Sequence, residues 1–352
     1  MPEPIPPGPW RARLKRVPGL APAVRWARAE WQRFLGAAVD VRWRAKLAVW
    51  PRAQRTGRVA QVWGDDAATR FSRLPRGWTD SDPIMWAHVF PLFGGIDWYE
   101  YIRQRFCPEP RAAGLSLCCG AGYVERDFLR RGILAACEGI DISPSAIELA
   151  RREAEAAGLS ERLTYRVADL ERASLDSGRY DVVIGWMALH HLRRLEHVFR
   201  EVRKALRPGG IFVVNEYVGP SRFQFPRRQV ARIDELLSEL PVELRRTPDG
   251  SVKERYQAPR LQEVVGHDPS EAVRSHRLLP LLRKHFVLAE CIGYGGTFLN
   301  GLLQGIVHNF DPQNEEHRHA LERLYAAERD AIDSGEFPSD YAFVIAQRPQ
   351  QR

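Results

Sequence analysis

The sequence of 352 residues has no uninterrupted apolar run of about eighteen residues, so we expect no membrane-spanning helix. Its cysteines are few, and their odd number and irregular spacing fit no disulfide framework, which indicates a reducing compartment. The amino terminus is rich in proline and lacks the apolar segment of a secretory signal peptide. These absences favour a cytoplasmic protein, with peripheral contact to the inner membrane surface as the one exception considered below.

Basic charge is concentrated near the amino terminus. Residues 1–60 carry thirteen Lys or Arg against three Asp or Glu, a net charge of +10, whereas the whole chain has +8. The segment also holds five tryptophans, and residues 22–48 have apolar side chains at helical spacing. An accessory helix pair that packs on the core explains this pattern most simply. An anionic membrane surface is the second interpretation. Nucleic acid ranks below both, because no nucleic-acid motif is present and the remaining residues are close to neutral.

The stretch from Leu115 to Gly122 carries the clearest signal in the chain. A short apolar run ends there in a turn with two glycines, an apparent helix follows from Tyr123, and a second apolar run ends at Asp141. This layout is typical of a nucleotide-binding half-fold, in which the acid accepts the hydroxyls of a ribose. A dinucleotide fingerprint needs a third glycine where this chain has Glu125, and a carboxylate there does not suit a pyrophosphate. The pattern therefore favours an adenosyl ligand without phosphates, such as S-adenosylmethionine (SAM).

Strand and helix signals alternate beyond this turn. Ser143 and Pro144 predict the start of a helix, and the next apolar segments predict strands over 163–168, 180–187 and 211–217. A helix over 193–206 ends at an Arg-Pro-Gly-Gly stop. Later segments at 285–294 and 341–347 also predict strands. Such alternation predicts an α/β fold with a mostly parallel sheet covered on both faces.

Residues 112–220 resemble the class I SAM-dependent methyltransferases. The resemblance lies in Leu-Ser-Leu-Cys-Cys-Gly-Ala-Gly, Gly-Ile-Asp-Ile-Ser, Ala-Asp-Leu, Tyr-Asp-Val-Val, Leu-His-His-Leu and Leu-Arg-Pro-Gly-Gly, in this order. It implies a seven-stranded Rossmann-like sheet, mostly parallel with an antiparallel last strand, and SAM as cofactor. The family usually has glycine in place of Cys118 and an acid in place of Ser116.

The resemblance also implies a set of cofactor contacts. The glycine turn would hold the methionine tail of SAM, the acid after the second strand its ribose, and the acid after the third strand the adenine amino group. The fourth strand would end beside the cofactor. The corresponding residues are Cys119, Gly120 and Gly122 for the tail, Asp141 for the ribose, Ile142, Asp169 and Leu170 for the adenine, and Trp186 and Met187 beside the cofactor.

Positions just beyond the fourth and fifth strands face the methyl group in this fold. A hydroxyl acceptor must lose its proton to a base, usually His, Asp or Glu. We favour His190 or Glu216 as this base, with His191 as a further catalytic candidate and Tyr217 as a substrate residue. Other substrate candidates are Tyr294 and the pair Asp268 and Glu271, although that pair also fits the first turn of a helix starting at Pro269.

The expected domains follow the same division. Residues 1–20 form a disordered proline-rich tail, residues 21–110 a basic and aromatic helical lid segment, and residues 111–352 the methyltransferase domain. Helical insertions at 219–284, including one helix over 223–240, and at 295–338 would cap the substrate. We expect no metal site, because His317 and His319 diverge on their helix and no other cluster has ligand spacing.

The function expected is SAM-dependent methyl transfer to a small-molecule, lipid-linked or glycan acceptor at oxygen. Capping insertions argue against a long polymer substrate. Two alternatives remain: an RNA methyltransferase that uses the basic arm, and a non-catalytic scaffold that keeps the SAM fold and binds partner proteins.

Overall fold

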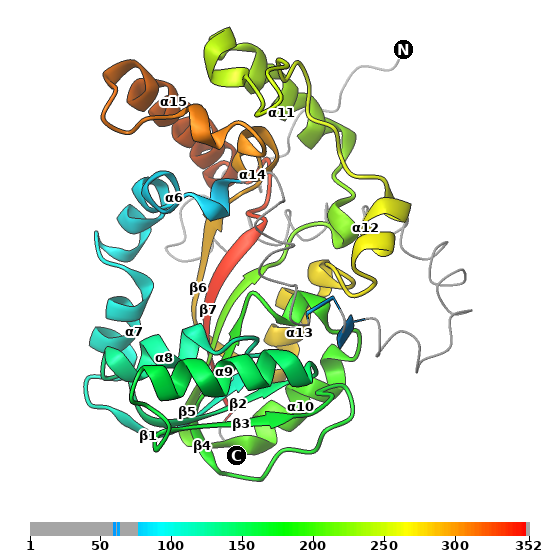
Figure 1. Cartoon of the computed structure of the whole chain (residues 1–352). Coiled ribbons are helices and arrows are strands. Elements are labelled where there is room, and N and C mark those ends of the chain that lie inside the picture. Colours follow the sequence, from blue (N-terminus) through cyan, green and yellow to red (C-terminus); the bar gives the residue numbers. More distant parts are fainter. Residues whose placement is uncertain (1–58, 61, 64–76, 350–352) are drawn as a thin grey trace, which may run out of the picture.

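The computed structural model describes residues 59–60, 62–63 and 77–349 (Figure 1). The proline-rich tail over 1–20, the helix expected over 22–48 and nearly all of the segment 1–60 proposed for membrane contact lie outside these residues. Within the described part of the chain, no helix has the length and apolar character needed to cross a membrane.

A seven-stranded sheet organises the molecule. Its order is β3-β2-β1-β4-β5-β7-β6. Neighbouring strands are parallel except where β7 pairs, antiparallel, with β5 and with β6. The strands are β1 (Arg111–Leu117), β2 (Leu134–Asp141), β3 (Leu163–Val167), β4 (Tyr180–Trp186), β5 (Leu206–Tyr217), β6 (Val287–Gly295) and β7 (Tyr341–Gln347). The expected α/β sheet with one antiparallel strand is confirmed.

Helices cover both faces of the sheet (Figure 1). One face packs against α7 (Trp98–Phe106), α8 (Tyr123–Arg130) and α9 (Pro144–Ala156). The other packs against α10 (Leu195–Ala205) and α13 (Leu278–His285). The central strands are buried almost throughout, because a sheet covered on both faces must place apolar side chains on both.

Two insertions follow β5 and β6, as expected. The first contains η4 (Ser221–Phe223), α11 (Arg227–Ser238), η5 (Val242–Arg245), α12 (Leu261–His267), η6 (Ser275–Arg277) and α13. The second contains α14 (Leu299–Leu303), η7 (Val307–Asn309) and α15 (Glu315–Asp333). The helix expected over 223–240 is shorter than predicted, because Pro226 precedes its first turn. In Figure 1, α11, α14 and α15 gather beyond the upper ends of the long strands β5, β6 and β7.

The start of α14 is fixed by one buried carboxylate from α15. Glu328 accepts the backbone N–H groups of Gly296, Phe298 and Leu299 and lies 3.4 Å from His88 Nε2. Helix N-termini attract negative charge, so Glu328 supplies the anion at this end of α14. The lid segment and the second insertion therefore form one packed unit.

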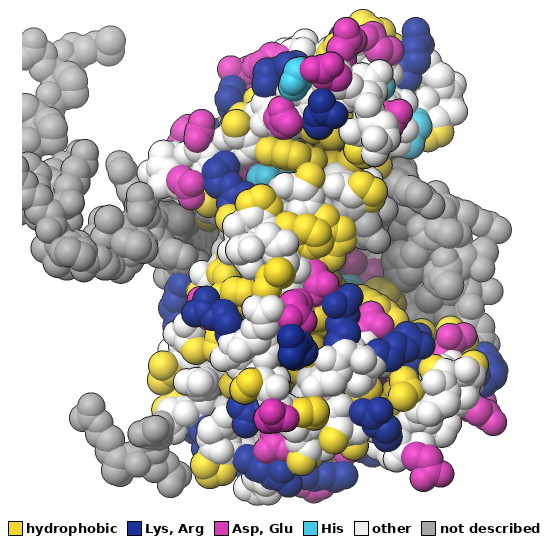
Figure 2. All heavy atoms as spheres, turned by 90° about the vertical axis from the view of Figure 1, so that its left-hand side faces the viewer, with side chains coloured by type: hydrophobic (Ala, Val, Ile, Leu, Met, Phe, Trp, Pro, Cys, Tyr) yellow, Lys and Arg dark blue, Asp and Glu magenta, His cyan; other side chains and the backbone are white. Residues whose placement is uncertain are grey.

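The described lid helices are η1 (Trp78–Asp80), α6 (Asp82–Val89), η2 (Phe90–Phe93) and α7. His88, Trp98 and Tyr101 are buried. Trp98 packs edge-on against Trp186, the last residue of β4. On the outer face of this region hydrophobic side chains run through the middle, with charged groups gathered above and below them (Figure 2). Rings of this segment, those of Phe93, Trp98 and Tyr101, thus contact rings on the sheet strands.

The prediction that a helix begins at Pro269, directly after Asp268, is wrong. Asp268 instead ends α12, and its carboxylate accepts the backbone N–H and the hydroxyl of Ser270. The guanidinium of Arg222 binds the backbone carbonyls of Pro269 and Glu271. Because a side chain satisfies these carbonyls, the loop needs no helical N–H groups, and the α-helix that follows starts only at Leu278.

Candidate functional site

The glycine turn and the end of β2 are joined by one carboxylate. Asp141 accepts the backbone N–H of Gly120 at 2.9 Å and that of Ser143 at 2.8 Å. Burial raises the pKa of Asp141, although these two N–H groups act against the rise. The two oxygens offer four lone-pair sites to the backbone N–H groups of Gly120, Ile142 and Ser143, so acceptor capacity remains for a ligand hydroxyl. The carboxylate is therefore placed against the turn as the sequence predicts, at the carboxyl edge of the sheet.

Backbone conformation explains why this turn needs glycine. Gly120 and Gly122 have φ of +53° and +76°. A Cβ on Gly122 would lie 2.4 Å from the hydroxyl oxygen of Tyr165, which packs under the turn from β3. Cys118, where the family usually has glycine, also has a left-handed φ of +49°. The chain thus keeps a conformation that favours glycine at three positions but uses cysteine at one of them.

Cys118 and Cys119 pack on opposite faces of the sheet, as expected for neighbours at a strand end. Cys119 belongs to the core on the side of α8 and α9, and Cys118 contacts the core on the side of α10 and α13. Burial raises the pKa of both thiols well above the usual range. Both therefore remain neutral packing groups.

Glu125 lies inside the protein rather than at the mouth of the turn. Its side chain is fully buried, and neither carboxylate oxygen has a hydrogen-bond partner of good geometry among the described residues. Burial raises the pKa of Glu125 to about 7, and the nearby hydroxyls of Ser116 and Tyr165 counter this only in part. The carboxylate thus occupies the interior next to Ser116, which stands where the family usually has its acid.

The remaining cofactor candidates lie along the same edge of the sheet. Ile142 directly follows Asp141, and Ala168 N–H donates to the Asp141 carbonyl, which brings Asp169 and Leu170 beside the end of β2. Asp169 is partly exposed and accepts the backbone N–H of Glu171 at 2.9 Å. Of two further candidates, Trp186 is the last residue of β4 and Met187 directly follows it.

Trp186 and Met187 are held by different contacts. The Trp186 ring stacks on Tyr99 of α7 with an interplanar angle of 9°. Met187 N–H donates to the carbonyl of Asn215, and its φ of +47° turns the chain sharply away from the sheet. That turn carries the chain to the two histidines.

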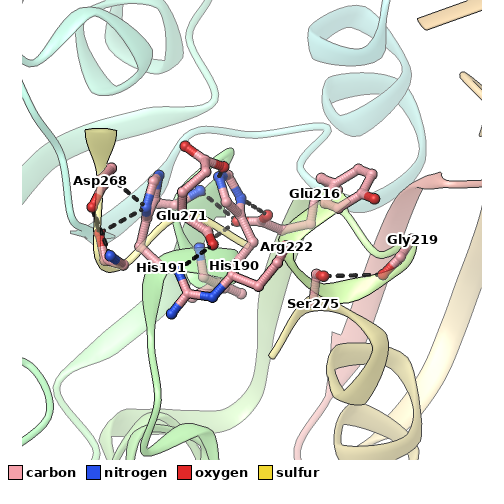
Figure 3. Close-up of polar contacts among 12 residues, drawn as sticks. His190, His191, Glu216, Gly219, Arg222, Asp268, Glu271 and Ser275 are labelled. Carbon is pink, nitrogen blue, oxygen red and sulfur yellow. Dashed lines mark hydrogen bonds and ion pairs between the residues drawn. The ribbon is translucent and has the colours of Figure 1, made fainter. Parts of the chain in front are cut away.

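His190, in the turn after β4, and Glu216, near the end of β5, form the central polar pair (Figure 3). His190 Nδ1 lies 2.6 Å from one oxygen of Glu216, and the other oxygen accepts the backbone N–H groups of Ala188 and Leu189. Burial lowers the pKa of His190, but the charge and hydrogen bond of Glu216 outweigh it, and the net effect raises the pKa to about 8. Glu216 is fully buried, so it orients His190 and the turn that carries it.

The first insertion adds a second set of polar groups to this pair. His191 Nδ1 lies 3.1 Å from Ser270 Oγ and 3.5 Å from Asp268 Oδ2. Glu271 Oε1 lies 3.6 Å from His190 Nε2. Burial, followed by the charges of His190 and Arg222, holds the pKa of His191 well below its usual range. The structure therefore brings together five sequence-predicted residues: His190, His191, Glu216, Asp268 and Glu271.

The two tyrosine candidates use their hydroxyls inside the protein. Tyr217 donates to the carbonyl of Pro220 at 2.8 Å, and Tyr294 donates to Asn215 Oδ1 at 2.6 Å. Both side chains are buried, and burial raises the pKa of Tyr294 well above its usual range. Both rings contact the ring of Tyr341, so the two tyrosines pack into one aromatic group.

Sequence reasoning missed three groups at this site. Arg222 shapes the loop after Asp268, Ser270 orients His191, and Trp63 places its ring 5.0 Å from the His191 ring. The sequence signal that could have pointed to Ser270 is the Asp-Pro-Ser-Glu segment. Its polar side chains lie in an insertion that is expected to cap the substrate.

The sheet order and the glycine turn with its acid are those of a class I SAM-dependent methyltransferase domain. Residues 115–210 match a family described as a methyltransferase domain. SAM is the cofactor of this class, which confirms the cofactor expected from the sequence.

Curated relatives include other methyltransferases. The chain is 31% identical over 156 residues to the ubiquinone biosynthesis O-methyltransferase of Methylocella silvestris, with 40% of this chain and 59% of that protein covered. It is 28% identical over 137 residues to a sterol 4-C-methyltransferase of Caenorhabditis elegans, with 37% and 40% covered. The chain thus spans about three fifths of the first relative's length. The geranyl diphosphate C-methyltransferase structure from Streptomyces coelicolor A3(2) is 14% identical, with 85% of this chain and 99% of that chain covered and a TM-score of 0.47.

Proposed function

We propose that this chain transfers the methyl group of SAM to an oxygen of a small-molecule, lipid-linked or glycan acceptor. The observation that carries the proposal is the 2.6 Å contact between His190 Nδ1 and Glu216 at the ends of β4 and β5. A carboxylate only accepts hydrogen bonds, so Nδ1 carries a proton, and in the neutral imidazole Nε2 is left for chemistry. That nitrogen points toward Glu271 and the first insertion.

In this proposal the cofactor lies along the edge formed by the ends of β1, β2, β3 and β4. Asp141 binds the ribose, the turn at Cys119, Gly120 and Gly122 receives the methionine tail, and Ile142, Asp169 and Leu170 bind the adenine. Trp186 and Met187 separate the cofactor from the histidines. The protein's main task is to align the acceptor oxygen, the methyl carbon and the sulfur, because the sulfonium is a good leaving group.

The acceptor would lie against the polar cluster. His190 takes the proton of the hydroxyl, Glu216 holds the imidazole in the required tautomer, and His191, Asp268 and Glu271 bind polar groups of the acceptor. Tyr217 and Tyr294 supply aromatic surface at the same end. The named relatives are an O-methyltransferase of ubiquinone biosynthesis and a sterol 4-C-methyltransferase, and apolar ring systems with oxygen substituents fit an aromatic and polar wall.

Calorimetry with SAM tests the cofactor part of the proposal. Asp141→Asn keeps the shape and one acceptor oxygen, and we expect it to weaken SAM binding about 10- to 100-fold through loss of charge-assisted hydrogen bonds. Asp176→Asn, on an exposed loop before β4, is the matched control and is expected to bind like the wild type. Wild-type protein that fails to bind SAM would favour the scaffold alternative instead.

Transfer of labelled methyl groups tests the acceptor part. The wild type is incubated with labelled SAM and a panel of hydroxylated quinols, sterols, terpenoids and glycosides. His190→Gln is expected to lower the rate about 10²- to 10⁴-fold on any acceptor used, with SAM affinity unchanged. An equal rate in this variant would remove His190 from the chemistry, and label recovered on carbon or nitrogen would remove the oxygen acceptor.

A further inference from the structure

The acceptor end contains three metal-ligating side chains whose donor atoms converge. His190, His191 and Glu271 each place one donor atom within 4.8 Å of the other two. Donor atoms around a cation such as Zn²⁺, bonded at about 2.0–2.2 Å, lie roughly 3–3.5 Å apart. Shifts of about 1 Å would therefore close the three groups around one ion. Figure 3 shows the two imidazoles next to each other, with Glu271 beside them.

Hydrogen bonds fix both imidazoles in the tautomer that a metal requires. Glu216 can only accept, so His190 carries its proton on Nδ1. The hydroxyl of Ser270 donates to Asp268 Oδ1, so its oxygen is left to accept from His191 Nδ1. In the neutral form of each imidazole, the Nε2 atom consequently keeps a free lone pair. Metal-bound histidines usually donate their other N–H to a carboxylate or a similar acceptor, and this cluster has such a partner for each histidine.

Charge also favours a divalent cation. Three carboxylates, those of Glu216, Asp268 and Glu271, surround the two histidines, and the guanidinium of Arg222 supplies one opposing charge. The group is left with a net charge of −2 when the imidazoles are neutral. Asp268 Oδ2 is buried without a hydrogen-bond partner among the described residues, and the ring of Trp63 lies against His191. Such a shielded and negatively charged group gains from binding a doubly charged ion.

We propose that His190, His191 and Glu271 bind a divalent transition-metal cation, with Zn²⁺ as the best fit to two imidazoles and one carboxylate, and that the cation binds the acceptor oxygen. Three protein ligands leave an open coordination position for that oxygen. The inference rests on the proposed methyl transfer and departs from the expectation, based on spacing in the sequence, that the chain holds no metal.

The cation changes the path of the proton. With both imidazoles engaged as ligands, the acceptor hydroxyl binds the cation and loses its proton to a solvent water rather than to His190. A lone pair of the oxygen then forms the new O–C bond. The C–S bond breaks, and its electron pair stays on sulfur, which becomes a neutral thioether. The ion keeps its charge throughout, and no oxidant or reductant is needed.

Zinc binding to the full chain tests the site without an activity assay. The protein is stripped with a chelator, dialysed and titrated with Zn²⁺ by calorimetry, and Co²⁺ is added in parallel to record its visible absorption. We expect one Zn²⁺ per chain and an intense Co²⁺ spectrum typical of low coordination number. Glu271→Gln is expected to weaken Zn²⁺ binding at least about 100-fold, and Ser270→Ala, which removes a support of His191, about tenfold. The control His319→Gln, exposed on α15, should bind like the wild type.

SAM calorimetry on the same samples separates the two proposals. Variants that retain SAM affinity are folded, so a loss of zinc in them belongs to the site. Wild-type protein that binds SAM without stoichiometric Zn²⁺, or Glu271→Gln that binds zinc as tightly as the wild type, overturns the cation and leaves His190 as the base. Protein that binds zinc at this site but not SAM refutes the methyl transfer instead.

Discussion

Glu125 makes a quantitative prediction about stability, because its carboxyl group is buried beneath the glycine turn. Its pKa rises from an ordinary value of 4.5 to about 7 in the folded chain. Each unit of difference corresponds to about 1.4 kcal/mol, so the rise corresponds to about 3 kcal/mol. The folded chain binds the proton more tightly than the unfolded chain, so stability falls as pH rises from 4.5 to 7 and the full penalty remains above pH 7.

The substitution Glu125→Gln keeps the size of the side chain and removes its charge. We expect the variant to be more stable than the wild type at pH 8 by about 2–3 kcal/mol, and equal to it near pH 4.5, where the wild-type carboxyl is already protonated. The hydroxyl oxygens of Ser116 and Tyr165 can accept from the new amide. Urea unfolding at pH values from 5 to 8 measures the difference in free energy of unfolding.

Glu161→Gln serves as the matched control because Glu161 is exposed. Its unfolding free energy should follow the wild type at every pH, within about 0.5 kcal/mol. If the free energies of wild type and Glu125→Gln stay parallel from pH 5 to pH 8, the buried carboxyl does not titrate as described and the reasoning is refuted.

Three further substitutions test the backbone and the lid. Cys118→Gly should change the free energy of unfolding by less than about 1 kcal/mol, because relief of the left-handed backbone offsets the greater entropy of the unfolded chain. Cys118→Val places a β-branched residue in that conformation and should lower the free energy of unfolding, measured in urea, by about 2 kcal/mol. Gly122→Ala should abolish SAM binding in calorimetry, and Tyr165→Phe in the same chain should recover part of it by removing the clashing hydroxyl. Glu328→Gln should lose about 2–3 kcal/mol at pH 7, because the charge that binds the N–H groups opening α14 is gone, and equal melting temperatures would contradict this.

The fold was predictable because local signals and burial agreed along the central strands. The apolar runs that end in Asp141 and Trp186 mark strands that are buried over most of their carboxyl-terminal halves. The turn after β1 needs glycine because Gly120 and Gly122 have left-handed backbone. Those features depend on neighbours within a few residues. The same holds for Ser143, whose hydroxyl caps α9 as predicted by accepting the Ala146 N–H.

The loop after Asp268 was not predictable in the same way. An Asp-Pro-Ser-Glu segment favours the start of a helix when the segment is exposed to water. Residues close to it in the sequence give no sign of another structure. In the folded chain Arg222, far along the sequence, takes the carbonyls of Pro269 and Glu271. A tertiary contact therefore overrides local capping preference. Residue spacing in the sequence could not predict that Glu271 lies beside His190 and His191 either, because the first insertion brings them together only in the folded chain.

The two ends of the site are coupled through Glu216. Its carboxylate binds the N–H groups of Ala188 and Leu189 and the imidazole of His190, and the neighbouring Asn215 carbonyl accepts from Met187. The turn that would border the cofactor is thus held from β5, the strand that also leads into the first insertion. Removing the Glu216 side chain would release the turn and His190 together. We therefore expect Glu216→Ala to weaken both SAM binding and methyl transfer, whereas His190→Gln should weaken transfer alone. Calorimetry and the labelled-methyl assay on both variants distinguish these outcomes, and a Glu216→Ala chain with normal SAM affinity would show that the cofactor end is held independently.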